Sequence, residues 1–137
     1  MKKNVLTGRK VVGGCAEGEA LVTRETISGW GGIDPMTGII VDLRHELAGK
    51  CIAGKVLVYH GAKGSSGWSA FFHEARLNGV APLAMVFNET TTKIALGAVV
   101  TRVPAVTDLD QDPTIVIETG DWVRVDGDAG TVEVTKK

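Results

Sequence analysis

The sequence predicts a mixed α/β fold in which a parallel core is extended by antiparallel strands. Glycine makes up 18 of the 137 residues and lies between short apolar runs, which indicates tight turns rather than a flexible tract. Residues 55–87 show the order strand, helix, strand, which is the pattern of a parallel βαβ unit. Residues 122–134 show the alternation of a β-hairpin around an Asp-Gly turn. We therefore expect one domain, residues 1–137, of the α/β class.

The two strands of the βαβ unit are expected at residues 55–59 and 82–87. In the first, Val56, Leu57 and Val58 do not alternate with polar residues. An unbroken apolar run of this length is typical of a strand that is buried on both faces, as the strands of parallel sheets are.

The helix of the unit is expected at residues 69–78. Trp68, Phe72 and Ala75 fall on one face of such a helix, so that face is predicted to be buried. The Asn-Gly pair at the end of the range is a signal for the C-terminus of a helix.

Other elements are expected on both sides of this unit. Short strands are predicted at residues 8–14, 18–26, 39–41, 122–125 and 132–134. The segment 90–106 is ambiguous, because residues 93–99 fit a short helix and residues 103–106 fit a third parallel strand.

Composition and charge exclude several classes of protein. Hydrophobic residues make up 44% and charged residues 23%, which is ordinary for a soluble globular protein. A net charge of −1 gives no electrostatic footprint for nucleic acid or an anionic membrane. No apolar run approaches the roughly 20 residues of a spanning helix, and the first residues lack an apolar signal core. We expect a cytoplasmic protein.

The two cysteines, Cys15 and Cys51, are too few and too far apart in sequence for a metal motif. We expect buried, reduced thiols, with a disulfide as the alternative. No metal ligand is predicted in this chain.

The loop 61–67 is the main candidate for a functional site. It follows a buried strand and leads into the predicted helix, so it lies at the carboxyl end of a parallel strand, where α/β proteins bind ligands. Lys63, Gly64, Ser65 and Ser66 lie in this loop, and the unpaired N–H groups of a helix start favour an anion. Capping of the helix by one serine is an equally good interpretation.

Two familiar motifs do not fit this loop. In a Walker A loop the lysine follows the last glycine, whereas Lys63 precedes the serines. The hydrolase pattern G-x-S-x-G is absent, and a triad would need a histidine. His73 is predicted to be a surface or packing residue of the helix, and His45 lies in a polar connector.

The chain resembles the small, swivel-domain subunit of aconitase X-type dehydratases, in the aconitase superfamily. The stretches that carry the resemblance are GRKVVGGCAEGEALVTRE, WGGIDPMTGIIVD, ELAGKCIAGKVLVYHGAKGSS and GDWVRVDGDAGTVEV, with VAPLAMV and IALGAVV between the last two. Each piece is weak alone, but the ordered set is specific and spans nearly the whole chain. The resemblance implies a swivelling three-layer β/β/α domain.

The resemblance also implies a reaction and a partner. The reaction would be loss of water from a small 3-hydroxy acid, in a complex with a larger subunit that carries an iron–sulfur centre. Ser65 would take the proton alpha to the carboxylate, Ser66 and Gly64 would help hold the substrate, and Lys63 would pair with its carboxylate or phosphate. This chain has only two cysteines, Cys15 and Cys51, so it cannot supply the usual cysteine ligands of an iron–sulfur cluster. We expect the isolated chain to be inactive.

A serine hydroxyl becomes a base only where N–H groups, a cation and exclusion of water stabilise its alkoxide. The loop departs from the family pattern at Gly67 and Trp68, and the arginine that follows the serines in true aconitases is absent. We expect Trp68 to pack as the first hydrophobic residue of the helix, with a place in the pocket as the alternative. Trp30 and Asp34 are placed at the subunit interface or pocket rim, although Asp34 fits a turn equally well.

Two substrates fit the family, cis-3-hydroxy-L-proline and (R)-5-phosphomevalonate, because both carry a hydroxyl beta to a carboxylate. A phosphorylated substrate would require several basic groups near the loop, and the sequence places only Lys63 there. The sequence therefore favours the hydroxyproline substrate. An alternative of another class is a non-catalytic carrier or docking module, for which His60 would be the residue that carries a phosphoryl group.

Overall fold

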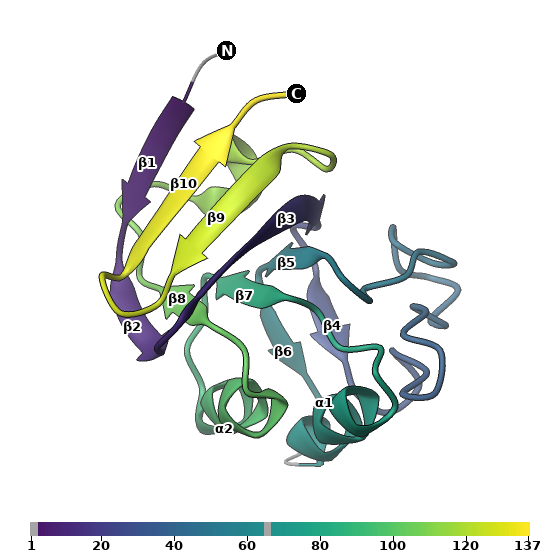
Figure 1. Ribbon diagram of the computed structural model, residues 1–137. Helices are drawn as coiled ribbons and strands as arrows, with labels where there is room; N and C mark the ends of the chain where they lie inside the picture. The colour runs from purple at the N-terminus through teal and green to yellow at the C-terminus, as the bar shows by residue number, and fades with distance from the viewer. Residues whose placement is uncertain (1–2, 65–66) are drawn as a thin grey trace.

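The computed structural model, which describes residues 3–64 and 67–137, has three layers: an antiparallel sheet, a mostly parallel sheet and a layer of helices (Figure 1). The strands are β1 (Lys3–Thr7), β2 (Arg9–Val12), β3 (Cys15–Val22), β4 (Thr26–Ser28), β5 (Val56–Tyr59), β6 (Gly61–Lys63), β7 (Ala84–Phe87), β8 (Ala105–Thr107), β9 (Trp122–Asp126) and β10 (Thr131–Thr135). The helices are α1 (Trp68–Leu77), α2 (Thr92–Thr101) and α3 (Pro113–Val116). The α/β class and the three-layer architecture are as predicted.

The predicted βαβ unit is present at the centre of the fold. β5 and β7 pair in parallel with Val56 opposite Ala84, and α1 connects them. The two segments that were ambiguous in sequence form α2 and β8, and β8 is the third parallel strand, next to β7. The tail forms the predicted hairpin of β9 and β10, with Val125 opposite Val132.

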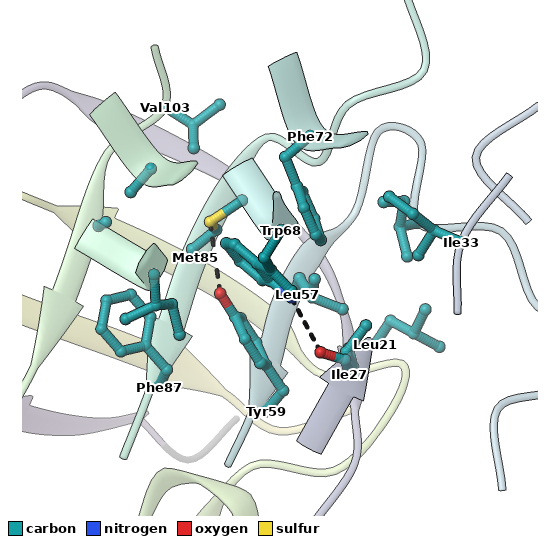
Figure 2. Close-up of a cluster of buried hydrophobic side chains, with 14 of the residues drawn as sticks. Leu21, Ile27, Ile33, Leu57, Tyr59, Trp68, Phe72, Met85, Phe87 and Val103 are labelled. Atoms are coloured by element: carbon teal, nitrogen blue, oxygen red, sulfur yellow. Dashed lines mark hydrogen bonds between the residues drawn. The ribbon is translucent and has the colours of Figure 1, made fainter. Parts of the chain in front are cut away.

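Alternating side chains of β5 face two separate hydrophobic cores. Val56 and Val58 point into the core between the two sheets, whereas Leu57 and Tyr59 point toward the helices (Figure 2). All four side chains of β5 are fully buried. This two-sided burial is the physical reason that the strand has no polar alternation, because each face of the strand meets an apolar layer.

β3 joins the two sheets because its two halves pair with different strands. The half from Cys15 to Glu19 pairs antiparallel with β9, and the half from Ala20 to Val22 pairs parallel with β5. The strand order β1-β10-β9-β3-β5-β7-β8-β2 follows from this division.

β1 and β2 lie at the two ends of this strand order, although only Gly8 separates them in sequence. The N–H of Gly8 donates to the carbonyl of Gly130 at 2.7 Å. A Cβ at Gly8 would lie 2.4 Å from the carbonyl oxygen of Thr107, so the close approach of the chain here requires glycine. The first and last strands of the sheet are thereby linked.

Two expectations about local structure differ from the fold. Residues 39–41 form no strand; Ile39 and Ile40 make isolated bridges to Cys51 and Ile33 within a long connection. β1 was not predicted, because Val5 and Leu6 form too short an apolar run to signal a strand. Within the described residues, no helix is long and apolar enough to cross a membrane.

Candidate functional site

A pocket of about 270 Å³ opens where β4 and β6 end and α1 begins. Its walls combine backbone, one charged group and two indole rings. The lining residues are Ser28, Gly29, Trp30, Lys63, Gly64 and Trp68. Lys63 and Gly64 of the predicted loop therefore border a hollow of the surface, as residues of a binding site would.

β4 and β6 form a small parallel sheet of their own that positions one wall of the pocket. Ile27 pairs with Ala62, and Ser28 pairs with Lys63, so both strands end at the same level. The carboxyl ends of parallel strands are the usual place for a ligand. Neither the strand β6 nor its pairing with β4 was predicted, because each strand has only three residues.

Trp68, the first residue of α1, also lines the pocket. Its side chain is 1% exposed and stacks on Phe72 with ring centroids 4.2 Å apart. Its Nε1 donates a hydrogen bond of 2.9 Å to the carbonyl of Ile27 (Figure 2). The prediction that Trp68 packs as the first hydrophobic residue of the helix is confirmed, and the ring also borders the pocket.

Ser65 and Ser66, the predicted proton acceptor and its neighbour, lie outside the described residues. The N-cap position of α1 is Gly67, which has no side chain. Gly64 has a φ of +105°, a left-handed conformation that favours glycine. Lys63 is exposed at the pocket and, among the residues that the structure describes, has no ion pair or side-chain hydrogen bond.

A second lysine reaches the loop from α2. The Nζ of Lys93 donates a 2.6 Å hydrogen bond to the carbonyl oxygen of Gly64, and the Lys93 side chain is half-buried. In sequence the two residues are 29 positions apart, and the lysine lies in the segment whose structure was ambiguous. The only sequence signal for this contact is the presence of a lysine at the start of a possible helix.

Trp30 and Asp34 have different roles in the structure. Trp30 is 84% exposed at the pocket and meets Phe71 edge-on, with ring centroids 6.0 Å apart. Asp34 forms a turn: its Oδ1 accepts a bond from the N–H of Met36 at 2.9 Å, and its carbonyl accepts one from Gly38 at 2.7 Å. Trp30 therefore lies at the pocket rim, and Asp34 is a turn residue.

Tyr59 lies behind the pocket, next to Trp68, and belongs to the core. Burial raises the pKa of its phenol well above the ordinary value, and its hydroxyl contacts the Sδ of Met85 at 3.5 Å (Figure 2). Tyr59 therefore stays protonated and is not available as a base.

Two of the histidines are held by neighbours. The Nε2 of His60 lies 3.7 Å from Oε1 of Glu89, and its Nδ1 lies 3.4 Å from Nδ2 of Asn88. His45 is buried, and its Nδ1 accepts the N–H of Leu47, so its Nε2 carries the proton that is donated to the carbonyl of Thr26. The hydrogen bonds of His45 thus hold the long connection between β4 and β5 against β4.

His73 is exposed on α1, as predicted.

The carboxyl of Asp112 lies beside the His60 group and caps α3. Burial raises the pKa of Asp112, but hydrogen bonds from Thr114 and Asn88 outweigh it and hold this pKa below its ordinary value. Asp112 is therefore a charged cap of α3, and the carrier role of His60 stays an untested alternative.

The two cysteines do not have the burial that was expected for them. Cys15 and Cys51 are free thiols, but both are exposed rather than buried. Cys15 lies on a strand face that meets solvent, and Cys51 lies near the end of the long connection between β4 and β5. No group of three or more His, Cys, Asp or Glu side chains in the described ranges could hold a metal ion, so the residues described here do not fit a cluster.

Comparison with known proteins identifies the family. The family model for the aconitase X swivel domain matches residues 5–134. The chain is 44% identical to the phosphomevalonate dehydratase small subunit of Methanosarcina acetivorans, over 96% of this chain and 91% of the relative. It is 43% identical to the phosphomevalonate dehydratase small subunit of Thermococcus kodakarensis, over 94% and 95%.

A solved structure agrees with the sequence comparison. The crystal structure of Thermococcus kodakaraensis aconitase X in its holo-form superimposes with a TM-score of 0.91 at 41% identity, covering 97% of this chain and 99% of the other. The chain belongs to the aconitase X swivel-domain family. Within that family it is the small subunit of an aconitase X-type dehydratase, and hence part of a hydro-lyase.

Proposed function

We propose that this chain is the small subunit of an (R)-5-phosphomevalonate dehydratase. The observation that carries the proposal is the name shared by the relatives from Methanosarcina acetivorans and Thermococcus kodakarensis, which match nearly the whole chain at 44% and 43% identity. These comparisons favour the alternative substrate over cis-3-hydroxy-L-proline, for which they give no support.

The two lysines at the loop support a phosphorylated substrate. In the sequence only Lys63 lies near the serines, and this is why the sequence alone favours the unphosphorylated substrate, hydroxyproline. The fold adds Lys93, whose Nζ lies 2.6 Å from the carbonyl of Gly64. Neither ammonium has a carboxylate within 4.0 Å in the described part of the chain. Lys63, which lines the pocket, can therefore pair with an anionic group of the substrate, and Lys93 adds positive charge beside the loop.

The proposed reaction removes water across two carbons of the substrate. The Ser65 alkoxide takes the proton from C2, next to the carboxylate, and becomes a hydroxyl. The electron pair of the C2–H bond forms a double bond between C2 and C3, and the hydroxyl on C3 takes a proton from a general acid that the larger subunit would supply and leaves as water. Ser65 must then release its proton to restore the alkoxide. Ser66 and the N–H of Gly64 would hold the substrate, and Lys63 would pair with its carboxylate or phosphate.

The partner would be a larger subunit that supplies the rest of the site. An iron–sulfur centre, which would act as the Lewis acid at the departing hydroxyl, is placed on that subunit because the described residues of this chain do not fit one. The exposed Trp30, at the pocket rim, is the residue that we expect the larger subunit to cover. The cytoplasmic location expected from the sequence stays a prediction.

The test is to produce the chain together with the larger subunit of its own host under anaerobic conditions. The purified complex is incubated separately with (R)-5-phosphomevalonate and cis-3-hydroxy-L-proline, and the products are followed by NMR. We expect an olefinic product from phosphomevalonate alone, and none from either subunit separately. Turnover of hydroxyproline in preference to phosphomevalonate would overturn the substrate.

A further inference from the structure

Lys93 is fixed in place by the start of α2. The N-cap residue Thr91 accepts a hydrogen bond from the N–H of Ile94, which sets the first turn of the helix. Lys93 is the second residue of that turn, and its half-buried side chain ends at the carbonyl oxygen of Gly64, 2.6 Å from Nζ. The short bond connects α2 to the loop that borders the pocket.

The bond leaves the positive charge of Lys93 available to the loop. Among the described residues no carboxylate lies within 4.0 Å of this ammonium, whereas lysines such as Lys3 and Lys55 pair with glutamates. A carbonyl accepts a hydrogen bond without neutralising the charge. A long lysine side chain loses conformational entropy when its position is fixed. The hydrogen bond between Lys93 and Gly64 must therefore offset this entropic cost.

The carbonyl that Lys93 binds belongs to the peptide group that leads into Ser65. Gly64 adopts a φ of +105°, and a Cβ there would meet nothing within 4 Å. Glycine is therefore required by the backbone conformation and not by lack of space. The carbonyl of this glycine accepts the hydrogen bond from Lys93 of α2.

We propose that Lys93 is a positioning residue for the Ser65 loop. It holds the carbonyl of Gly64, the residue that precedes Ser65 in the sequence, and supplies a positive charge at that carbonyl. A positive charge near a serine favours its anionic form. Lys63, which is free to meet the substrate, has the separate task of binding it. This inference rests on the proposed function, since it assumes that Ser65 is the proton acceptor.

The test compares three variants in the assembled enzyme. Lys93→Met keeps the aliphatic stem and removes donor and charge, Lys93→Arg keeps both, and Lys55→Met is the matched control. Lys55 is also half-buried, but it precedes β5 and so lies at the opposite end of that strand from the loop. We expect Lys93→Met to lower kcat about 100-fold with KM within about threefold, the effect typical of losing one pre-organised donor.

The other two variants separate positioning from simple loss of structure. We expect Lys93→Arg to recover activity to within about tenfold of the wild type, and Lys55→Met to stay within about twofold. Hydrogen exchange of the segment 60–68, measured by mass spectrometry in the complex, is expected to be about tenfold faster in Lys93→Met and unchanged in Lys93→Arg.

Several outcomes would overturn the inference. They are a kcat of Lys93→Met within about threefold of the wild type, an unchanged exchange rate in the segment 60–68, or a raised KM with normal kcat, which would make Lys93 a substrate-binding residue. Ser65→Ala is assayed alongside: if it alone is inactive while Lys93→Met is normal, the inference fails and the proposed function stands. If the wild type turns over neither hydroxy acid, the proposed function fails, and the exchange measurement still decides whether Lys93 holds the loop.

Discussion

The indole Nε1 of Trp68 donates a hydrogen bond of 2.9 Å to the backbone carbonyl of Ile27. This bond joins the first residue of α1 to β4, and residues of both elements line the pocket. Both side chains are buried at 1% exposure, so the pocket wall is an extension of the hydrophobic core. The shape of the site and the stability of the fold therefore depend on the same contacts.

Replacing Trp68 with phenylalanine is expected to destabilise the chain by about 2–3 kcal/mol. The variant loses the N–H donor and part of a ring that stacks on Phe72, and it leaves a gap in a packed core. The free energy of unfolding is measured by urea titration, followed by far-UV circular dichroism because the fluorescence changes with the substitution.

The matched control is Trp122→Phe. Trp122 also donates through Nε1, to the carboxylate of Glu17 at 3.0 Å, but its side chain is 47% exposed. We expect this variant to lie within about 0.5 kcal/mol of the wild type. If both variants lost the same free energy of unfolding, the larger effect expected from the burial of Trp68 would be contradicted.

Replacing Gly97 with alanine is expected to destabilise the chain by about 1–3 kcal/mol, in the same urea assay. Alanine is favoured over glycine inside a helix by about 1 kcal/mol, so helix propensity alone predicts the opposite sign. A Cβ at Gly97, however, would lie 2.2 Å from Cζ3 of Trp68, whose ring is held on both sides by Phe72 and Tyr59. A more stable Gly97→Ala variant would mean that this ring can move.

Replacing Asp121 with asparagine is expected to cost about 2–3 kcal/mol at neutral pH. The buried carboxylate accepts bonds from Nζ of Lys136 at 2.5 Å and from the N–H groups of Glu118 and Lys137, and so secures the C-terminal segment. Hydrogen bonds to a charged group are worth about 1.5–3 kcal/mol, and asparagine cannot accept all of them. The control is Glu133→Gln, on an exposed pair with Lys3, which we expect to change stability by under about 0.5 kcal/mol.

The Asp121 carboxylate also makes the free energy of unfolding fall at acid pH. Burial raises the pKa of Asp121, but the bonds from Lys136 and two N–H groups outweigh it, so the pKa lies below its ordinary value. A lowered pKa contributes stability that is present above the unfolded value, near pH 4, and is lost as pH falls through the folded pKa. The stability difference between wild type and Asp121→Asn should shrink in that range. A difference that stays constant down to pH 2 would contradict this.

Replacing Lys63 with methionine is expected to raise KM for phosphomevalonate by about 10- to 100-fold and to leave kcat within about threefold. Lys63 lines the pocket without a partner of its own among the described residues, so its charge is free for the substrate. A charge-assisted bond of about 1.5–3 kcal/mol corresponds to this change in KM. Steady-state kinetics of the complex provide the measurement, with Lys63→Arg as the control that keeps the charge. A fall in kcat at constant KM would place Lys63 in the chemical step instead.

The central part of the fold could be predicted because its signals are local. The apolar run of β5, the one-sided helix α1 and the hairpin of β9 and β10 each follow from periodicity within a short window. β4 and β6 could not be predicted, since three-residue strands carry no period and their pairing depends on residues far apart in sequence.

The site was predictable only in part, for the same reason. The pattern of glycines, lysine and serines after a buried strand indicated the loop, and Lys63 and Gly64 do border the pocket. Lys93 was missed because its contact with Gly64 spans 29 positions and exists only after α1 and α2 pack together. The exposure of Cys15 and Cys51 was also missed, because the general tendency of cysteine to be buried says nothing of a particular strand face or connection.

The role of Ser65 as proton acceptor is tested by following loss of the C2 proton in the assembled complex that carries Ser65→Ala. Phosphomevalonate carrying deuterium at C2 is incubated with wild-type and variant complexes, and loss of the label is followed by NMR together with product formation. We expect the Ser65→Ala variant to fold and to bind the larger subunit. Phosphomevalonate incubated with this variant should keep its deuterium, whereas the wild-type complex should release deuterium as it forms product. Release of the label by Ser65→Ala at a rate near that of the wild type would remove Ser65 from the reaction.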